Sequence, residues 1–110
     1  QNTGWYDFPY YLNINEDGNE LLPQSIELQQ NFPNPFNGST VIPYELSINS
    51  QVRISVINIL GEEIIVLVND KKPPGKYNVV WSSGKIPSGV YFIKLETGNK
   101  RTVVKTLLLK

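Results

Sequence analysis

From residue 22 onward, apolar and polar side chains alternate in short runs that are rich in Val, Ile, Tyr and Thr. Gly, Pro, Asn and Ser separate these runs about every 8 to 12 residues, which is the spacing of strands and turns in an all-β domain. No segment shows the roughly 3.6-residue period of a helix, and Pro or Gly interrupts most windows long enough to hold one. We therefore predict an all-β antiparallel β-sandwich of about seven strands. The predicted strands are residues 26–29, 40–46, 52–59, 63–68, 76–82, 89–96 and 101–109.

The alternation also assigns side chains to the core, because successive residues of a strand point to opposite faces. Trp81 is the largest of the inward side chains and is expected to anchor the core. Turns are expected at Asn37 with Gly38, at Gly61, and at Pro74 with Gly75, and Gly61 is expected to supply a positive φ. The predicted inward sets are Val52, Ile54 and Val56; Tyr77, Val79 and Trp81; and Tyr91, Ile93 and Leu95.

The stretch NFPNPFNGSTVIPYEL, residues 31–46, holds three prolines and two phenylalanines around the start of a predicted strand. A proline fixes its own φ near −65° and pushes the preceding residue into an extended conformation. Phe32 and Asn34 are therefore expected to be extended, and Phe32 and Phe36 are expected to insert into the edge of the core. Pro43 predicts that its strand lies at an edge or carries a bulge. The whole stretch is interpreted as a rigid cover over an open end of the sandwich.

Residues 1–21 do not alternate in this way, and we interpret them as a linker or the tail of a preceding domain, with the sandwich at residues 22–110. Their aromatic side chains either dock on the sandwich or form a carbohydrate-binding platform. The chain has no methionine and no targeting leader at its start, so we expect it to be part of a longer precursor. The platform residues would be Trp5, Tyr6, Tyr10 and Tyr11.

Residues 13–24 resemble the start of a calcium-binding EF-hand loop, with Asn13, Asn15 and Asp17 at ligand positions. Such a loop closes with a bidentate acid, whereas Gln24 stands at that position here. No helical pattern flanks the segment. A solvated acidic linker is therefore the favoured interpretation, and a calcium site is the alternative.

The composition argues against catalysis. The chain has no His and no Cys, so it lacks the side chains that most often serve as general bases, thiol nucleophiles and zinc ligands. Glu62 and Glu63 are adjacent, and in a regular strand they would point to opposite faces and could not act as a facing carboxylate pair. We predict that the protein is not an enzyme and needs no cofactor.

The formal net charge is zero, but the charges are unevenly placed. Residues 1–50 hold six acids and no base, whereas residues 51–110 hold ten bases and four acids. In the favoured interpretation, strands from the two halves pair and neutralise each other; in the alternative, the second half presents a basic face to a partner. Nucleic acid is not the expected partner, because the bases are not clustered with stacking aromatic side chains. No stretch approaches the roughly 20 apolar residues of a membrane span.

Several motifs, in order, resemble the C-terminal sorting domains of the bacterial type IX secretion system. LPQSIELQQNFPNPFNGSTVIPYEL resembles the family's opening signature, VRISVINILGEEI its hairpin, PPGKYNVVW a later strand, and IPSGVYFIKLETGNKRTVVKTLLLK its ending. The match covers about residues 22–110 and departs from the pattern at Gly38, Asn58 and Glu62. A related immunoglobulin-like module of flagellar hook-capping proteins shares part of the pattern, so the resemblance implies an immunoglobulin-like sandwich. The motif residues are Asn31, Phe32, Pro33, Asn34, Pro35, Phe36, Asn37, Gly61 and Trp81.

The resemblance implies a non-catalytic signal that directs a larger precursor, by way of the periplasm, to the surface of a Gram-negative bacterium or to the medium. The implied partners are an outer-membrane translocon, a sortase-like attachment enzyme and the upstream cargo domain. An accessory immunoglobulin-like module, which contacts carbohydrate or a neighbouring domain of a secreted enzyme or adhesin, is the alternative function. The residues expected to contact the translocon are Gly89, Val90, Tyr91, Lys100, Arg101, Lys105, Leu107, Leu108, Leu109 and Lys110.

Overall fold

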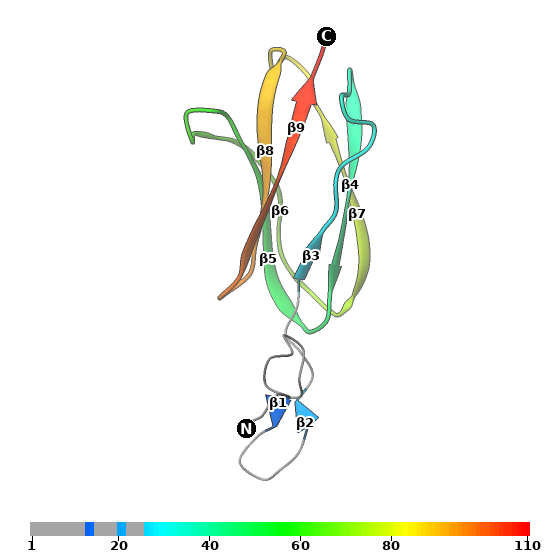
Figure 1. Cartoon of the computed structure of the whole chain (residues 1–110), viewed down its shortest axis with the longest axis vertical. Coiled ribbons are helices and arrows are strands. Elements are labelled where there is room, and N and C mark those ends of the chain that lie inside the picture. The colour runs from blue at the N-terminus through cyan, green and yellow to red at the C-terminus, as the bar shows by residue number, and fades with distance from the viewer. Residues whose placement is uncertain (1–12, 15–19, 22–25) are drawn as a thin grey trace, which may run out of the picture.

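The structure is a computed structural model that describes residues 13–14, 20–21 and 26–110. Seven strands in the last of these segments form two antiparallel sheets that pack face to face (Figure 1). The predicted all-β sandwich is therefore confirmed. No helix occurs among the described residues, and so none is long and apolar enough to cross a membrane. The strands are β1 (Asn13–Ile14), β2 (Glu20–Leu21), β3 (Ile26–Leu28), β4 (Ser39–Leu46), β5 (Ser50–Ile57), β6 (Glu63–Lys72), β7 (Gly75–Ser82), β8 (Gly89–Glu96) and β9 (Arg101–Leu108).

The smaller sheet of the sandwich has the strand order β3-β4-β7, and the larger sheet has the order β6-β5-β8-β9. β1 and β2 pair only with each other. The direction of the strands defines two ends of the sandwich. β3 starts at one end, close to the turn between β8 and β9, and β9 finishes at the other, where β4 begins and β7 finishes (Figure 1). We call this second end the C-terminal end.

The inner faces of both sheets supply the core. The predicted inward residues of β5 and β8 are all buried, and in β7 the predicted anchor Trp81 is fully buried. The ring of Trp81 lies 5.0 Å from that of Phe36 and 5.7 Å from that of Tyr91, in tilted and edge-on contacts that aromatic pairs favour. The buried apolar residues are Phe36, Ile42, Tyr44, Leu46, Val52, Ile54, Val56, Trp81, Tyr91, Ile93, Leu95 and Leu108.

The hairpin of β5 and β6 is longer and less regular than predicted. β6 continues to Lys72, and two register shifts leave Leu67 and Ile64 without a residue directly opposite on β5. Gly61 has the predicted positive φ, 83°. The turn around it projects sideways from the sandwich (Figure 1). Bulges of this kind increase the local twist of a hairpin, which accounts for the projection.

The prediction that Pro43 marks an edge strand or a bulge is wrong. β4 is the central strand of its sheet and pairs in regular register with β3 and β7. The carbonyl of Pro43 accepts a hydrogen bond from Gln29 N (3.0 Å), so its backbone faces the point just beyond Leu28, where β3 ends. The nitrogen of Pro43 faces the β3 side of the strand. The absence of an N–H on it therefore removes no hydrogen bond from the ladder with β7.

Candidate functional site

The residues predicted for recognition come together only in part. β8 and β9 pair so that residues 89–91 lie opposite residues 106–108 at the C-terminal end of the larger sheet (Figure 1). Residues 109–110 follow directly. Residues 100–101 lie at the opposite end, where the turn leads into β9. The predicted set therefore divides into two places, and most of it gathers at the C-terminal end.

The residues predicted for recognition also differ in burial. Tyr91 and Leu108 are 5% and 0% exposed, so both are part of the core. The hydroxyl of Tyr91 also donates a hydrogen bond to the carbonyl of Pro87 (2.6 Å). By contrast, Leu109 is 51% exposed and Lys105 is also exposed. A partner of the folded domain can reach the second pair but not the first.

Residues 30–37, which we call the strap, run beside the outer edge of β9. Phe36 N donates to the carbonyl of Leu107 (3.0 Å), and Leu109 N donates to the carbonyl of Phe36 (2.9 Å). The peptide bonds before both prolines of the strap are cis. The strap thus occupies backbone groups that an edge strand would otherwise leave open to another chain.

Two asparagine amides of the strap extend this contact. Asn31, which is 1% exposed, donates through Nδ2 to Thr106 Oγ1 (2.7 Å) and Thr40 Oγ1 (2.9 Å). Asn34 Oδ1 accepts a hydrogen bond from Leu107 N (3.0 Å). Because a buried polar group costs free energy unless it is paired, these bonds hold the strap against β9 of the larger sheet and β4 of the smaller sheet.

The two phenylalanines of the strap have different positions. Phe36 is 2% exposed and packs on Trp81, so its predicted insertion into the core is confirmed. The same prediction is wrong for Phe32, whose side chain is 57% exposed. Phe32 contributes its backbone instead, through hydrogen bonds of 3.0 and 2.8 Å with Val41 of β4. The strap therefore joins β4 to β9 and closes one side of the sandwich.

The loop between β7 and β8 also binds the last residue, Lys110. Lys110 N donates to Ser88 Oγ (2.9 Å), and the ammonium group of Lys110 contacts the carbonyl of Gly84. Both partners belong to the loop between β7 and β8. The last residues are thus bound by the strap on one side and by this loop on the other.

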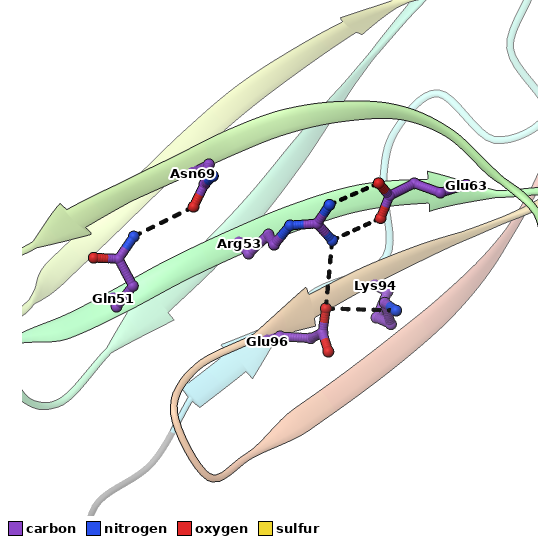
Figure 2. Close-up of polar contacts among 6 residues, drawn as sticks. All are labelled: Gln51, Arg53, Glu63, Asn69, Lys94 and Glu96. Atoms are coloured by element: carbon purple, nitrogen blue, oxygen red, sulfur yellow. Dashed lines mark hydrogen bonds and ion pairs between the residues drawn. The ribbon is translucent and has the colours of Figure 1, made fainter.

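A polar network crosses the outer face of the larger sheet (Figure 2). Arg53 donates from both Nη atoms to the two carboxylate oxygens of Glu63, each at 2.6 Å, and lies 3.7 Å from Glu96. Lys94 lies 3.4 Å from Glu96. The hydrogen bonds from Arg53 hold the pKa of the Glu63 carboxyl below its ordinary value and raise the pKa of the guanidinium. Ser55 lies on the same outer face of the larger sheet and is fully buried, so neighbouring side chains of that face cover it.

The ion pairs lie in the second half of the chain. The three ion pairs found among the described residues join β5, β6 and β8, all within residues 51–110. Strands of the two halves also pair, since β4 pairs with β7 and Glu45 lies directly opposite Lys76. Asp7, Glu16 and Asp17 lie outside the described residues, so the favoured charge interpretation stays a prediction.

The described residues show no arrangement for metal chemistry: no group of three or more His, Cys, Asp or Glu side chains in them is placed to hold a metal ion. Of the calcium candidates, Asn13 lies in β1, while Asn15 and Asp17 lie outside the described residues, as do the aromatic side chains of the carbohydrate interpretation. The structure instead presents β9, which the strap holds in place, and the outer face of the larger sheet, which carries polar and apolar side chains. Both are features suited to binding.

Sequence reasoning missed four residues that organise the site. Thr40 and Thr106 accept hydrogen bonds from the buried amide of Asn31, and Arg53 with Glu63 forms the shortest ion pair found on the outer face. A threonine on the core side of two predicted strands was a usable signal, because a buried hydroxyl needs a partner. No such signal existed for the ion pair, since bulges set which residues of β5 and β6 meet.

Comparison with known proteins adds three findings. A family model described as "Secretion system C-terminal sorting domain" matches residues 30–110. No curated protein matches the sequence.

Among solved structures, the chain is similar to the crystal structure of dimeric latent PorU from Porphyromonas gingivalis, with a TM-score of 0.60 and 15% sequence identity. The similarity covers 81% of this chain and 10% of that chain, so the chain corresponds to about a tenth of its neighbour. At this identity the likeness supports the fold.

Proposed function

The chain belongs to the family of secretion system C-terminal sorting domains, the signals of type IX secretion, and from this membership we propose that the machinery recognises the folded domain at its C-terminal end. A sorting domain directs a larger precursor to export, to the cell surface or to the medium. Such domains are generally non-catalytic, and we infer that this chain too has no enzymatic activity of its own.

The proposal rests on the contacts that hold residues 108–110 in place. Leu108 is buried in the core, and the strap and the loop before β8 bind Leu109 and Lys110. The exposed side chains of this end are thus presented in one fixed arrangement. A fixed arrangement binds a partner with less loss of conformational entropy than a loose tail does.

The burial of the predicted recognition residues indicates which of them a partner can reach. We assign direct contact to the accessible members, and a supporting role to Tyr91 and Leu108 because they are in the core. The partner we propose is an outer-membrane translocon reached from the periplasm of a Gram-negative cell, followed by a sortase-like attachment enzyme. The members assigned to contact at the C-terminal end are Gly89, Val90, Lys105, Leu107, Leu109 and Lys110.

The test is export of a periplasmic reporter fused to residues 22–110 in a host that has the secretion system. Leu109→Asp places a charge on an exposed position at the C-terminal end and is expected to lower export with an unchanged midpoint of thermal unfolding. Val80→Asp is the matched control, because Val80 is 57% exposed on the other sheet, and it is expected to leave export unchanged. Export of the Leu109→Asp fusion at the level of the parent would exclude recognition at this end.

A further inference from the structure

A partner of this domain has little access to the strand edges of the larger sheet. The strap covers the outer edge of β9, and Gln30 Nε2 adds a hydrogen bond to the carbonyl of Lys105 (2.8 Å). Addition of a foreign strand there would have to displace the strap and remove Phe36 from the core. The edge of β9 is therefore not the surface that a partner of the folded domain uses.

The other edge of the larger sheet, β6, is protected in a different way. Its two register shifts interrupt the regular ladder around Ile64 and Leu67. The regular part that follows carries Asp70, Lys71 and Lys72. Bulges and charges are the devices by which natural edge strands avoid pairing with other chains. In the larger sheet, contact with a partner is thus left to the outer face.

The outer face of the larger sheet carries apolar side chains from its middle to the C-terminal end. Residues directly opposite each other in a sheet share a face: Ile57 lies opposite Phe92 and Val90 lies opposite Leu107, and charged residues of β6 and β9 lie beside the first pair. Val66 and Val103 on this face are 39% and 46% exposed. The apolar members are Ile57, Val66, Val90, Phe92, Val103 and Leu107.

The same face is basic. Its two acids, Glu63 and Glu96, are engaged by Arg53 and Lys94 (Figure 2). Three further bases on it have no ionic partner among the described residues. They are Lys71, Arg101 and Lys105.

The outer face of the smaller sheet lacks this combination. It carries Glu27, Glu45 and Lys76, so acids outnumber bases there. Its exposed valine, Val80, lies directly opposite Val41 and has Asn78 and Ser82 on either side of it along β7. The two faces of the sandwich therefore differ in the sign of their charge, and a partner that is selected by charge discriminates between them.

We propose that the outer face of the four-stranded sheet is a docking surface for an acidic protein surface with an apolar patch, on a component of the secretion machinery. The inference rests on the proposed function and deepens it, because this face borders the C-terminal residues assigned to recognition. β3 starts at the opposite end of the sandwich, so a cargo that precedes β3 in the precursor leaves open the part of this face that lies near the C-terminal end (Figure 1). The apolar residues supply affinity, and the bases of the same face supply selection and steering.

The first experiment measures export of the reporter fusion when this face is altered at exposed positions. Val103→Asp and the double variant Arg101→Gln with Lys105→Glu are each expected to reduce export about tenfold, which corresponds to about 1.4 kcal/mol of binding. Matched changes on exposed positions outside the face, Val80→Asp and Lys76→Glu with Lys85→Gln, are expected to have no effect. All four proteins should unfold at the temperature of the parent, which separates lost docking from lost folding.

The second experiment identifies the partner. A photo-crosslinking amino acid placed at Val103 is expected to give adducts with a protein of the export machinery, mapped to a segment rich in Asp and Glu, whereas the same group at Val80 is not. Adducts with lipid, with a basic segment, or equally from both positions would overturn the proposal. If the parent fusion is exported and the face variants are exported equally well, the docking surface is excluded while the sorting function stands. If the parent fusion itself stays in the periplasm, the sorting function fails and the docking surface fails with it.

Discussion

At the residue scale, Phe32 and Phe36 have the same side chain and belong to the same strap, yet only Phe36 contributes to the core. Phe36→Ala removes a buried ring from its contact with Trp81 and is expected to lower the free energy of unfolding by about 3–5 kcal/mol. Phe32→Ala removes an exposed ring and is expected to change that free energy by less than about 0.5 kcal/mol. Urea unfolding of the two variants checks this, and equal losses would contradict it.

The same pair shows what the sequence could and could not predict. In β5 the period of two assigned Val52, Ile54 and Val56 to the core correctly, because a strand allows only two faces. The strap has no such period, so its sequence does not determine which phenylalanine points inward. That choice depends on which backbone groups pair with β4 and which with β9, and these are contacts between distant parts of the chain.

Arg53 and Glu63 give a pH prediction at the same scale. The hydrogen bonds from Arg53 lower the pKa of Glu63 in the folded state, so the stabilisation they give is present above the ordinary pKa of a glutamate and is lost as the pH falls through the lowered value. In Arg53→Leu the pKa of Glu63 is expected to move up toward its ordinary value. An NMR titration of the side-chain carboxyl measures the midpoint, and an unchanged midpoint would show that the ion pair does not form in solution.

At the scale of elements, the structure makes the strap and β9 one unit. Asn31→Ala leaves the hydroxyls of Thr40 and Thr106 without their buried donor and is expected to cost about 1–3 kcal/mol of stability, as is Thr106→Val. Because both changes remove the same hydrogen bond, the double variant is expected to cost less than the two single losses combined. Chemical denaturation of the three variants forms the cycle.

Asn37→Ala is the control for this cycle. Asn37 belongs to the same strap, but its side chain is exposed, so a change of less than about 0.5 kcal/mol is expected. Losses from Asn31→Ala and Thr106→Val that add without coupling would mean that the strap and β9 are stabilised separately.

The elements also show where prediction from sequence stops. Alternation predicted β8 with its observed bounds, Gly89–Glu96, but it ended β6 four residues early at Val68. The rest of β6, residues 69–72, is polar and no longer alternates, so only its pairing with β5 makes it a strand. Pro43 was misread for the same reason: the effect of a proline on a strand depends on what its nitrogen faces, and the neighbouring strand decides that.

At the scale of the whole molecule, the expected domain boundary at residue 22 can be tested through stability. Every buried apolar residue of the described part of the chain belongs to residues 36–108, so a chain of residues 22–110 is expected to unfold at the same temperature as residues 1–110. A chain of residues 38–110 lacks β3 and the strap. It loses Phe36 from the core and the donor of Asn31 to Thr106, and it exposes the edge of β9.

The shorter chain is therefore expected to unfold cooperatively at a much lower temperature, or not to fold, and to associate through the uncovered edge. Thermal unfolding followed by circular dichroism measures the first effect, and light scattering measures the second. If residues 38–110 were as stable and as monomeric as residues 22–110, the strap would be an accessory to a core that is complete without it. Because Phe36 and Leu108 come from the two ends of residues 22–110 and are both buried, we expect the opposite: the sandwich is complete only when its first and last segments meet.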